Sequence, residues 1–261
     1  MIRFLFIVCC LSLPFLYKEI THGFRVNKLY LARKGGEVQH HEAAALLLNQ
    51  PFSYLGRGLQ CFVFESHDGQ VVLKLFNIAK RKFLQERTEK TLQACQLAFE
   101  LAREETGLLY IHVDSTDKQG LSVYLKNGFG ISRFLSLDKY AFVIQKKAQP
   151  FKETILKALE QNRADPFIDS YLTLIYQRAS KGLCNTDVAI MRNFGFLGEG
   201  ALEIDFGNYI YSPEEKREEF QRFALRMRRF IKKYAPHYLS RYDEKVSGYR
   251  YMVIDKESKG S

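Results

Sequence analysis

The sequence predicts an α+β protein in which a small antiparallel sheet lobe with one long helix precedes a helical half. Short aromatic and β-branched runs between residues 52 and 76 predict strands, and residues 80–105 contain no glycine or proline, which favours a helix. Beyond Pro150 the apolar residues follow a helical period as far as Lys181, interrupted near Asp165-Pro166. The 261 residues, 46% of them hydrophobic, suffice for one large domain or two small lobes.

Residues 1–17 form an apolar run that is interrupted by Arg3 and Ser12. At about 14 residues, its core is shorter than the ~20 of a spanning helix and matches a signal peptide, yet no small-x-small cleavage site follows. Basic residues are more abundant after the run than before it, which favours a cytoplasmic body. We therefore expect residues 2–17 to be a membrane anchor. The alternatives are a cleaved signal on a secreted or periplasmic protein, and a buried first helix or strand.

Residues 18–51 are weakly periodic and are expected to connect this run to the sheet. Residues 52–148 then predict the sheet domain, with strands at 52–55, 61–66 and 71–76 and an Asp-Gly turn between the last two. The long helix is expected to end at Gly107, because glycine readily takes the left-handed cap conformation. More strands are expected at 108–113, 121–125, 131–137 and 140–145, and residues 149–261 predict the helical domain.

A glycine pair and a lysine in the first three strands suggest a phosphate site. Gly56-Arg57-Gly58 separates two strands, where glycines allow positive φ and let backbone N–H groups approach phosphates. Lys74 follows Gly56 by eighteen residues inside an apolar strand, and a half-buried ammonium needs a carboxylate or a phosphate. The alternative is an ordinary hairpin with its lysine on an exposed pleat.

Three oxygen donors follow in the second half of the chain. Asp187 lies in a predicted loop, Asn193 comes six residues later, and Asp205 precedes Phe206-Gly207 after an apolar strand. Carboxylate and amide oxygens are the groups expected around a magnesium nucleotide. A strand-turn-strand between Asn193 and Asp205 is expected to hold the three on one edge.

The order of these motifs over residues 52–210 resembles the two-lobe fold of atypical protein-kinase-like proteins. The chain also looks like uncharacterised kinase-like proteins of chlamydia-related bacteria, in segments such as 104–112 and 193–196. The resemblance implies Mg²⁺ and ATP as cofactors. It implies that Lys74 grips the α- and β-phosphates, that Asp187 is the general base for an acceptor hydroxyl, and that Asp205 and Asn193 hold the metal.

The resemblance also implies which further residues contact the nucleotide. The expected nucleotide-binding residues are Gly56, Arg57, Gly58, Val63, Lys74 and Gln145. Residues 140–148 correspond to the last strand and hinge, whose backbone meets adenine. A helix carboxylate should pair with Lys74, and Glu100 is preferred to Glu89 because it lies nearer the helix end; Glu86 and Glu104 qualify by type.

The sequence departs from the kinase pattern at several motif positions. Cys61 replaces the third glycine, Asn185-Thr186 precede Asp187, Ala189 replaces a lysine, and no Ala-Pro-Glu segment follows Gly207. With only 54 residues after Gly207, the helical lobe is abbreviated. Two hypotheses stay open: a phosphotransferase that acts on a protein or small-molecule hydroxyl, and a pseudokinase that binds nucleotide or serves as a scaffold.

The net charge of +10 is concentrated near the C-terminus, since residues 216–250 carry eleven basic and four acidic side chains. A helix there has an apolar face and a basic face, the latter formed by Arg222, Arg226, Arg229 and Lys233. The basic face is either solvated or a docking surface for anionic lipid or an acidic partner. No stacking or helix-turn-helix signature indicates a specific nucleic-acid partner.

Overall fold

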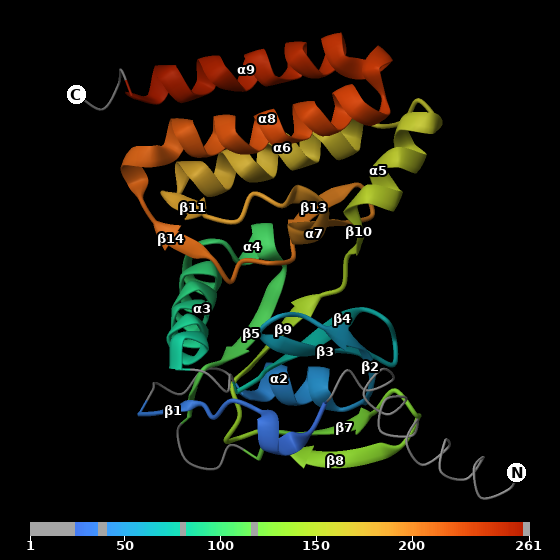
Figure 1. Ribbon diagram of the computed structural model, residues 1–261, viewed down its shortest axis with the longest axis vertical. Helices are drawn as coiled ribbons and strands as arrows, with labels where there is room; N and C mark the ends of the chain where they lie inside the picture. The colour runs from blue at the N-terminus through green and yellow to red at the C-terminus, as the bar shows by residue number, and fades with distance from the viewer. Residues whose placement is uncertain (1–23, 36–40, 79–81, 116–119, 258–261) are drawn as a thin grey trace, which may run out of the picture. The chain divides into compact units, whose positions relative to one another are not determined.

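The structure is a computed structural model that describes residues 24–35, 41–78, 82–115 and 120–257 (Figure 1). The chain divides into two compact units. Unit 1 comprises the described parts of Met1–Glu89 and Leu109–Lys147, and unit 2 those of Lys90–Leu108 and Ala148–Ser261. The expected anchor at residues 2–17 lies outside the described residues. Within the described ranges, no helix combines the length and apolar character needed to cross a membrane.

Unit 1 contains a seven-stranded sheet in the order β5-β9-β4-β3-β2-β7-β8. The pairs β2–β3, β3–β4, β4–β9 and β7–β8 are antiparallel, and β2–β7 is parallel. Every strand predicted in this half is confirmed to within about two residues. The strands are β2 Pro51–Arg57, β3 Cys61–Ser66, β4 Val71–Phe76, β5 Leu108–His112, β7 Ser122–Lys126, β8 Ser132–Ser136 and β9 Phe142–Lys146.

The central strands of the sheet are runs of apolar residues, and in β3 buried and half-buried side chains alternate. In β3, Phe62 and Phe64 point into the core and are fully buried, whereas Val63 between them is half-buried. The predicted turn between β3 and β4 is confirmed: Gly69 has φ +69, and the Asp68 carboxylate accepts a hydrogen bond of 3.0 Å from the Gln70 N–H.

The segment expected to be a connector contributes to the core of unit 1. It contains η1 Val26–Lys28, β1 Arg33–Lys34 and α2 His41–Leu48, and β1 pairs in parallel with β6 Asp114–Ser115. Leu29, Ala44 and Leu48 are buried in the cluster that includes the sheet residues. The segment therefore packs in the core of unit 1 although its weak periodicity did not predict buried residues.

The predicted long helix is confirmed as α3 Lys82–Leu101, followed by α4 Arg103–Thr106. Its residues belong partly to unit 1 and partly to unit 2. Gly107 ends α4 in the left-handed conformation with φ +63, as predicted, and its N–H donates to the Glu104 carbonyl.

Unit 2 is built on four longer helices: α5 Phe151–Glu160, α6 Asp165–Ser180, α8 Lys216–Tyr234 and α9 Leu239–Glu257. Within this unit α8 lies between α6 and α9 (Figure 1). Large aromatic side chains such as Phe151, Tyr171 and Phe223 fill the core and are fully buried.

Short strands and turns complete unit 2. The pair β12 Phe194–Leu197 and β13 Gly200–Glu203 forms the predicted strand-turn-strand, and β10 Gln149–Pro150 pairs with β12. A second pair joins β11 Leu183–Asn185 to β14 Tyr209–Tyr211. The remaining turns are α7 Ile190–Asn193, η2 Pro213–Glu215 and η3 Pro236–Tyr238.

Candidate functional site

The loop between β11 and α7 holds Asp187 in a defined geometry. The Asn185 side-chain oxygen accepts a hydrogen bond of 2.9 Å from the Asp187 N–H, and the Asp187 carboxylate accepts one of 3.0 Å from the Ala189 N–H. These two bonds are Asx turns, which shape the loop without a helix or a strand. The Asp187 side chain is 33% exposed, and Arg192 lies 3.9 Å from its second carboxylate oxygen. A carboxylate is therefore presented to solvent on a locally fixed backbone.

Asn193 links this loop to the β12–β13 hairpin. Its buried amide nitrogen donates to the Asp187 carbonyl oxygen at 2.8 Å. Its own carbonyl oxygen accepts from the N–H groups of Ile204 at 2.7 Å and Asp205 at 3.2 Å. The six-residue spacing between Asp187 and Asn193 thus brings the two residues into contact through the single turn of α7.

Asp205 follows β13 and has an exposed side chain. One of its carboxylate oxygens accepts from the Gly207 N–H at 3.3 Å, and its carbonyl oxygen accepts from the Asn185 amide at 3.1 Å. The Gly207 carbonyl accepts in turn from the Thr91 hydroxyl at 3.3 Å. The sequence-predicted residues Asp187, Asn193 and Asp205 are therefore neighbours in unit 2.

The donor set suits a magnesium ion that shares its coordination with a ligand. Because the Asn193 amide nitrogen faces Asp187, the amide oxygen is the atom of that side chain that can accept a cation. A carboxylate and an amide oxygen are hard ligands, and Mg²⁺ usually takes only one or two protein ligands beside water and phosphates. Among the residues that the structure describes, no cluster of three or more His, Cys, Asp and Glu side chains could hold a metal. The side chains of Asp205 and Asn193 are thus oxygen donors of the kind that Mg²⁺ accepts.

A buried ion network lies behind this site and was not predicted from the sequence. The Arg178 guanidinium on α6 donates to the Glu203 carboxylate at 2.6 Å and also to Glu219 on α8, and all three side chains are fully buried. Glu203 also accepts from the Tyr209 hydroxyl at 2.6 Å and the Asn185 amide at 2.7 Å. In the sequence, the sign of such a network was Glu203 itself, a charged residue in the apolar run of β13 that would need a partner if buried.

The protonation of the network follows from its geometry. Burial by itself lowers the pKa of Arg178, but the interactions with Glu203, Tyr209 and Glu219 together outweigh burial, and the net pKa is raised. Burial raises the pKa of Glu203, whereas Arg178, Tyr209 and Asn185 act to lower it. We take the pair as ionised, because a guanidinium does not lose its proton and Glu203 accepts charge-assisted hydrogen bonds. Burial, then Glu203, raises the pKa of Tyr209, which stays a donor.

The network fixes the start of the Asp187 loop. Glu219 accepts a hydrogen bond of 2.9 Å from the Asn185 N–H, and Arg222 donates to both Glu219 and, at 3.1 Å, the Asn185 carbonyl. Asn185 therefore uses its backbone and its side chain to join β11, α8 and the segment that carries Asp205. This arrangement explains why Asn185 is buried although it precedes an exposed loop.

The predicted phosphate-binding residues belong to unit 1. Lys74 is half-buried in β4, where it stands opposite Val63 of β3 and Val143 of β9. Gln145 is fully buried in β9 opposite Val72. The lysine is therefore not on an exposed pleat.

The glycine segment differs from the expectation in one respect. Gly56 and Arg57 belong to β2, which has a register irregularity between Tyr54 and Gly56, and Gly58 begins the turn. Neither glycine adopts the positive φ that glycine allows. The strand continues further than predicted because Gly56 and Arg57 pair with β3, and the Gly58 N–H donates to the Cys61 carbonyl at 2.9 Å.

The helix carboxylates differ in their surroundings. Glu100 is exposed on the part of α3 that belongs to unit 2, whereas Glu89 belongs to unit 1 with Lys74. The Glu89 carboxylate accepts a hydrogen bond from the Tyr30 hydroxyl. Burial, together with Glu89, raises the pKa of Tyr30 to about 12. The pairing of Lys74 with Glu100 stays a prediction.

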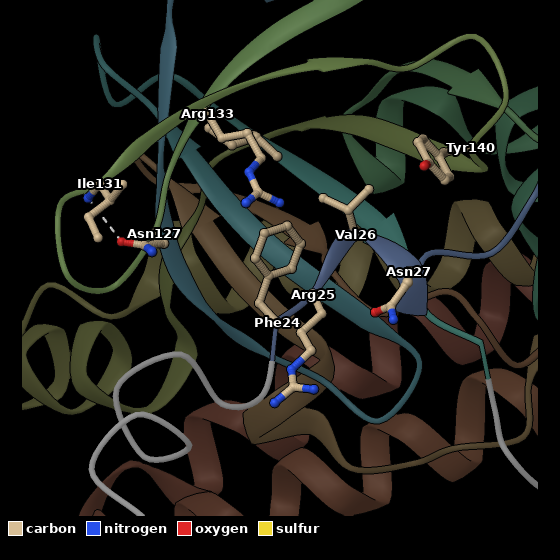
Figure 2. Close-up of a pocket in the computed structure, with 9 residues that line it drawn as sticks. Phe24, Arg25, Val26, Asn27, Asn127, Ile131, Arg133 and Tyr140 are labelled. Carbon is tan, nitrogen blue, oxygen red and sulfur yellow. Dashed lines mark hydrogen bonds between the residues drawn. The ribbon is translucent and has the colours of Figure 1, made fainter. Parts of the chain in front are cut away.

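Unit 1 also contains a cavity of about 620 Å³ that none of the predicted site residues lines (Figure 2). Its wall combines apolar side chains with two arginines and two asparagines, and Asn127 accepts from the Ile131 N–H at 2.9 Å. The lining residues are Phe24, Arg25, Val26, Asn27, Leu125, Asn127, Ile131, Arg133 and Tyr140. This cavity is thus distinct from the motifs that suggested nucleotide binding.

Comparisons with known proteins give little further guidance. No family model matches the sequence, and no curated protein matches it. A 2.2 Å crystal structure of WbdD has a TM-score of 0.37 and 12% identity, covering 60% of this chain and 32% of that one. A co-crystal structure of WbdD with the kinase inhibitor LY294002 has a TM-score of 0.39 and 13% identity, covering 73% of this chain and 44% of that one. The chain therefore spans less than half the length of either, and the α+β class rests on its own strands and helices.

Proposed function

We propose that the chain is a kinase-like phosphotransferase that binds Mg-ATP and transfers a phosphoryl group to a hydroxyl acceptor. The proposal rests chiefly on one observation, the contact of Asn193 with both Asp187 and Asp205. Both contacts use backbone atoms of the aspartates, so a loop and a hairpin make neighbours of three residues. Their side chains, two carboxylates and an amide, are the groups that phosphoryl transfer needs. The half-buried Lys74 of β4 agrees with the resemblance to protein-kinase-like proteins, which implies a phosphate-binding lysine at this position.

In this proposal each residue has one role. Asp205 and the Asn193 amide oxygen hold the magnesium, and bound Mg-ATP supplies a phosphoryl group whose negative charge the metal partly neutralises. Lys74 binds the phosphates through its ammonium. Asp187 orients the acceptor hydroxyl and accepts its proton, because its carboxylate is partly exposed and the Asx turns fix its backbone.

The decisive experiment measures thermal stabilisation by ATP with and without Mg²⁺. A ligand that binds only the folded state stabilises it by about 2.7 kcal/mol at a hundred times its Kd. We expect a Mg-dependent rise in the melting temperature, which Lys74→Ala and Asp205→Ala abolish. Asp187→Ala should keep the rise and lose phosphoryl transfer to the acceptor.

Matched controls distinguish loss of binding from general damage. Lys146→Ala removes an exposed lysine from β9 of the same sheet, and Glu199→Ala removes an exposed carboxylate from the turn of the β12–β13 hairpin. Both variants should keep the full shift. A shift that persists in Asp205→Ala would show that the metal site is elsewhere, and no shift in the parent protein would remove the proposal.

A pseudokinase is the second candidate, and the surroundings of Asp187 favour it. Asn185 stands two residues before Asp187 and is committed to the buried network, and Ala189 offers no cation to a transferred phosphate. A protein that shows the Mg-ATP shift but transfers no phosphoryl group, with Asp187→Ala indistinguishable from the parent, would fit this alternative.

A further inference from the structure

Helix α8 has two chemically distinct faces. Phe220, Phe223, Met227 and Ile231 are buried in the core of unit 2. On the other side lies the basic face, which we define as Arg222, Arg226, Arg229 and Lys233. The spacing of three or four residues aligns these side chains in a row of about 16 Å, since each residue adds about 1.5 Å along a helix.

Most of this row is exposed and not neutralised. Arg226, Arg229 and Lys233 are exposed, and within the part of the chain that the structure describes no carboxylate forms an ion pair with them. Lys233 lies 4.9 Å over the ring of Tyr234. Two nearby arginines differ: Arg222 is paired with Glu219, and Arg228 with Asp243. The sequence also has no acidic residue between Phe220 and Tyr242.

The basic face offers a row of charges instead of a pocket. The cavity beside α8, of about 260 Å³, lies against α9 and is lined by other residues of α8, among them Gln221 and Arg228. Two apolar side chains flank the row: Leu225 is 47% exposed and Tyr234 is 38% exposed. Tyrosine suits a boundary between water and an apolar phase, because its ring is apolar and its hydroxyl is polar.

We propose that the basic face of α8 binds the surface of a membrane rich in anionic lipids. The three unpaired cations of this row, Arg226, Arg229 and Lys233, match a planar array of headgroup phosphates and carboxylates better than they match a single acidic side chain. The apolar flank of Leu225 and Tyr234 and the apolar run at residues 2–17 of the sequence favour lipid over an acidic protein. This surface does not depend on the proposed nucleotide site.

The test compares co-sedimentation of the full chain with phosphatidylserine-containing and pure phosphatidylcholine vesicles. Any insertion by the N-terminal run acts on both vesicle types, so the ratio of the two partition coefficients isolates the charge-dependent part. Each cation near an anionic surface contributes about fivefold to partitioning. We therefore expect Arg226→Gln/Arg229→Gln/Lys233→Gln to lower the ratio by about 100-fold. Raising the salt concentration should lower it in the parent as well.

The control is Lys90→Gln/Lys157→Gln/Arg163→Gln, which removes three exposed cations of unit 2 outside the basic face and gives the same net charge. This control should keep most of the preference for phosphatidylserine vesicles that the parent shows. Far-UV circular dichroism should show that both triple variants are folded. An equal loss in the two variants would overturn the proposal in favour of a general charge effect. Binding of soluble polyaspartate, without a preference for phosphatidylserine, would overturn it in favour of an acidic protein partner.

Discussion

Arg178 stands between two buried carboxylates, and its removal leaves both without their cation. We predict that Arg178→Met lowers the free energy of unfolding by about 3–5 kcal/mol, because a broken buried ion pair strands an uncompensated charge. The measurement is denaturant unfolding followed by circular dichroism. Arg228→Met is the matched control, since Arg228 makes a two-bond pair with Asp243 that is partly exposed and should contribute little to stability. Equal small losses in both variants would contradict the network.

The structure leaves no room for a side chain at Gly195. A Cβ atom at this position would lie 2.6 Å from the Gln149 carbonyl oxygen and 2.8 Å from the Ala148 Cβ. We predict that Gly195→Ala destabilises unit 2 by about 1–3 kcal/mol, since the contact is with backbone and cannot be relieved by a side-chain rotation.

Gly56→Ala supplies the comparison for Gly195→Ala. No atom lies within 4 Å of a Cβ placed at Gly56, and its φ is not positive. The free energy of unfolding of Gly56→Ala should be unchanged or slightly higher than that of the parent, because alanine lowers the entropy of the unfolded chain. A Gly56→Ala loss as large as that of Gly195→Ala would contradict the backbone geometry of β2.

At the scale of single elements, the end of α4 depends on Gly107. Its φ of +63 is a conformation that costs alanine about 1 kcal/mol, so Gly107→Ala should lower the free energy of unfolding by roughly that amount. Gly107→Asn should lose less, because asparagine tolerates the left-handed region. Denaturant titrations of the two variants provide the measurement, and a larger loss for asparagine than for alanine would contradict the assigned cap.

Elements with local signals could be predicted from the sequence. Strands β3 and β4 follow from their aromatic and β-branched runs and the Asp68-Gly69 turn between them, and the β12–β13 hairpin follows from the glycines at its turn. In the same way, the proximity of Asn193 to Asp205 could be predicted, because a hairpin returns the chain to where it started. These features depend on neighbours that are close in sequence.

Features that depend on distant contacts could not be predicted. Arg178 and Glu203 meet only because α6 packs against β13, so two charges in apolar runs gave no sign of their pairing. Likewise α2 belongs to the core of unit 1 through Ala44 and Leu48, whose periodicity alone is weak. The first strand was predicted to end at Leu55 and ends at Arg57, because pairing of Gly56 and Arg57 with β3 decides their conformation and glycine composition does not.

At the scale of the whole molecule, we predict that the buried Tyr110 of unit 1 makes stability depend on alkaline pH. Burial, reinforced by Asp138, raises the pKa of Tyr110 to about 12 from an ordinary value near 10. A raised pKa means that the fold favours the protonated phenol. Its contribution is fully present below about pH 10 and is lost as the pH rises through about 12. Tyr110→Phe should therefore flatten the fall in stability between those values, by at most about 2 kcal/mol.

Denaturant unfolding of the parent and of Tyr110→Phe at several alkaline pH values tests this dependence. Tyr124→Phe removes the hydroxyl of an exposed tyrosine in β7 and should leave the pH dependence as in the parent. Parallel curves for the parent and Tyr110→Phe would show that burial of Tyr110 does not govern the alkaline transition.

The two units have separate hydrophobic cores, and no described residue belongs to both clusters. Local opening follows the packing of each cooperative part, so we expect the cores to differ in their protection against hydrogen exchange. Phe223→Ala removes a fully buried ring from unit 2 and should cost about 3–5 kcal/mol there. Exchange measured by mass spectrometry should accelerate strongly in residues 151–231, and much less in β3, β4 and β9.

Phe64→Ala is the reciprocal variant, because Phe64 is equally buried in the core of unit 1. It should accelerate exchange in β3, β4 and β9 and leave α6 and α8 protected. Because α3 contributes residues to both units, its exchange should respond to both variants. If instead each variant accelerated exchange uniformly along the chain, the units would unfold as one cooperative structure, and the separation of the two cores would have no thermodynamic counterpart.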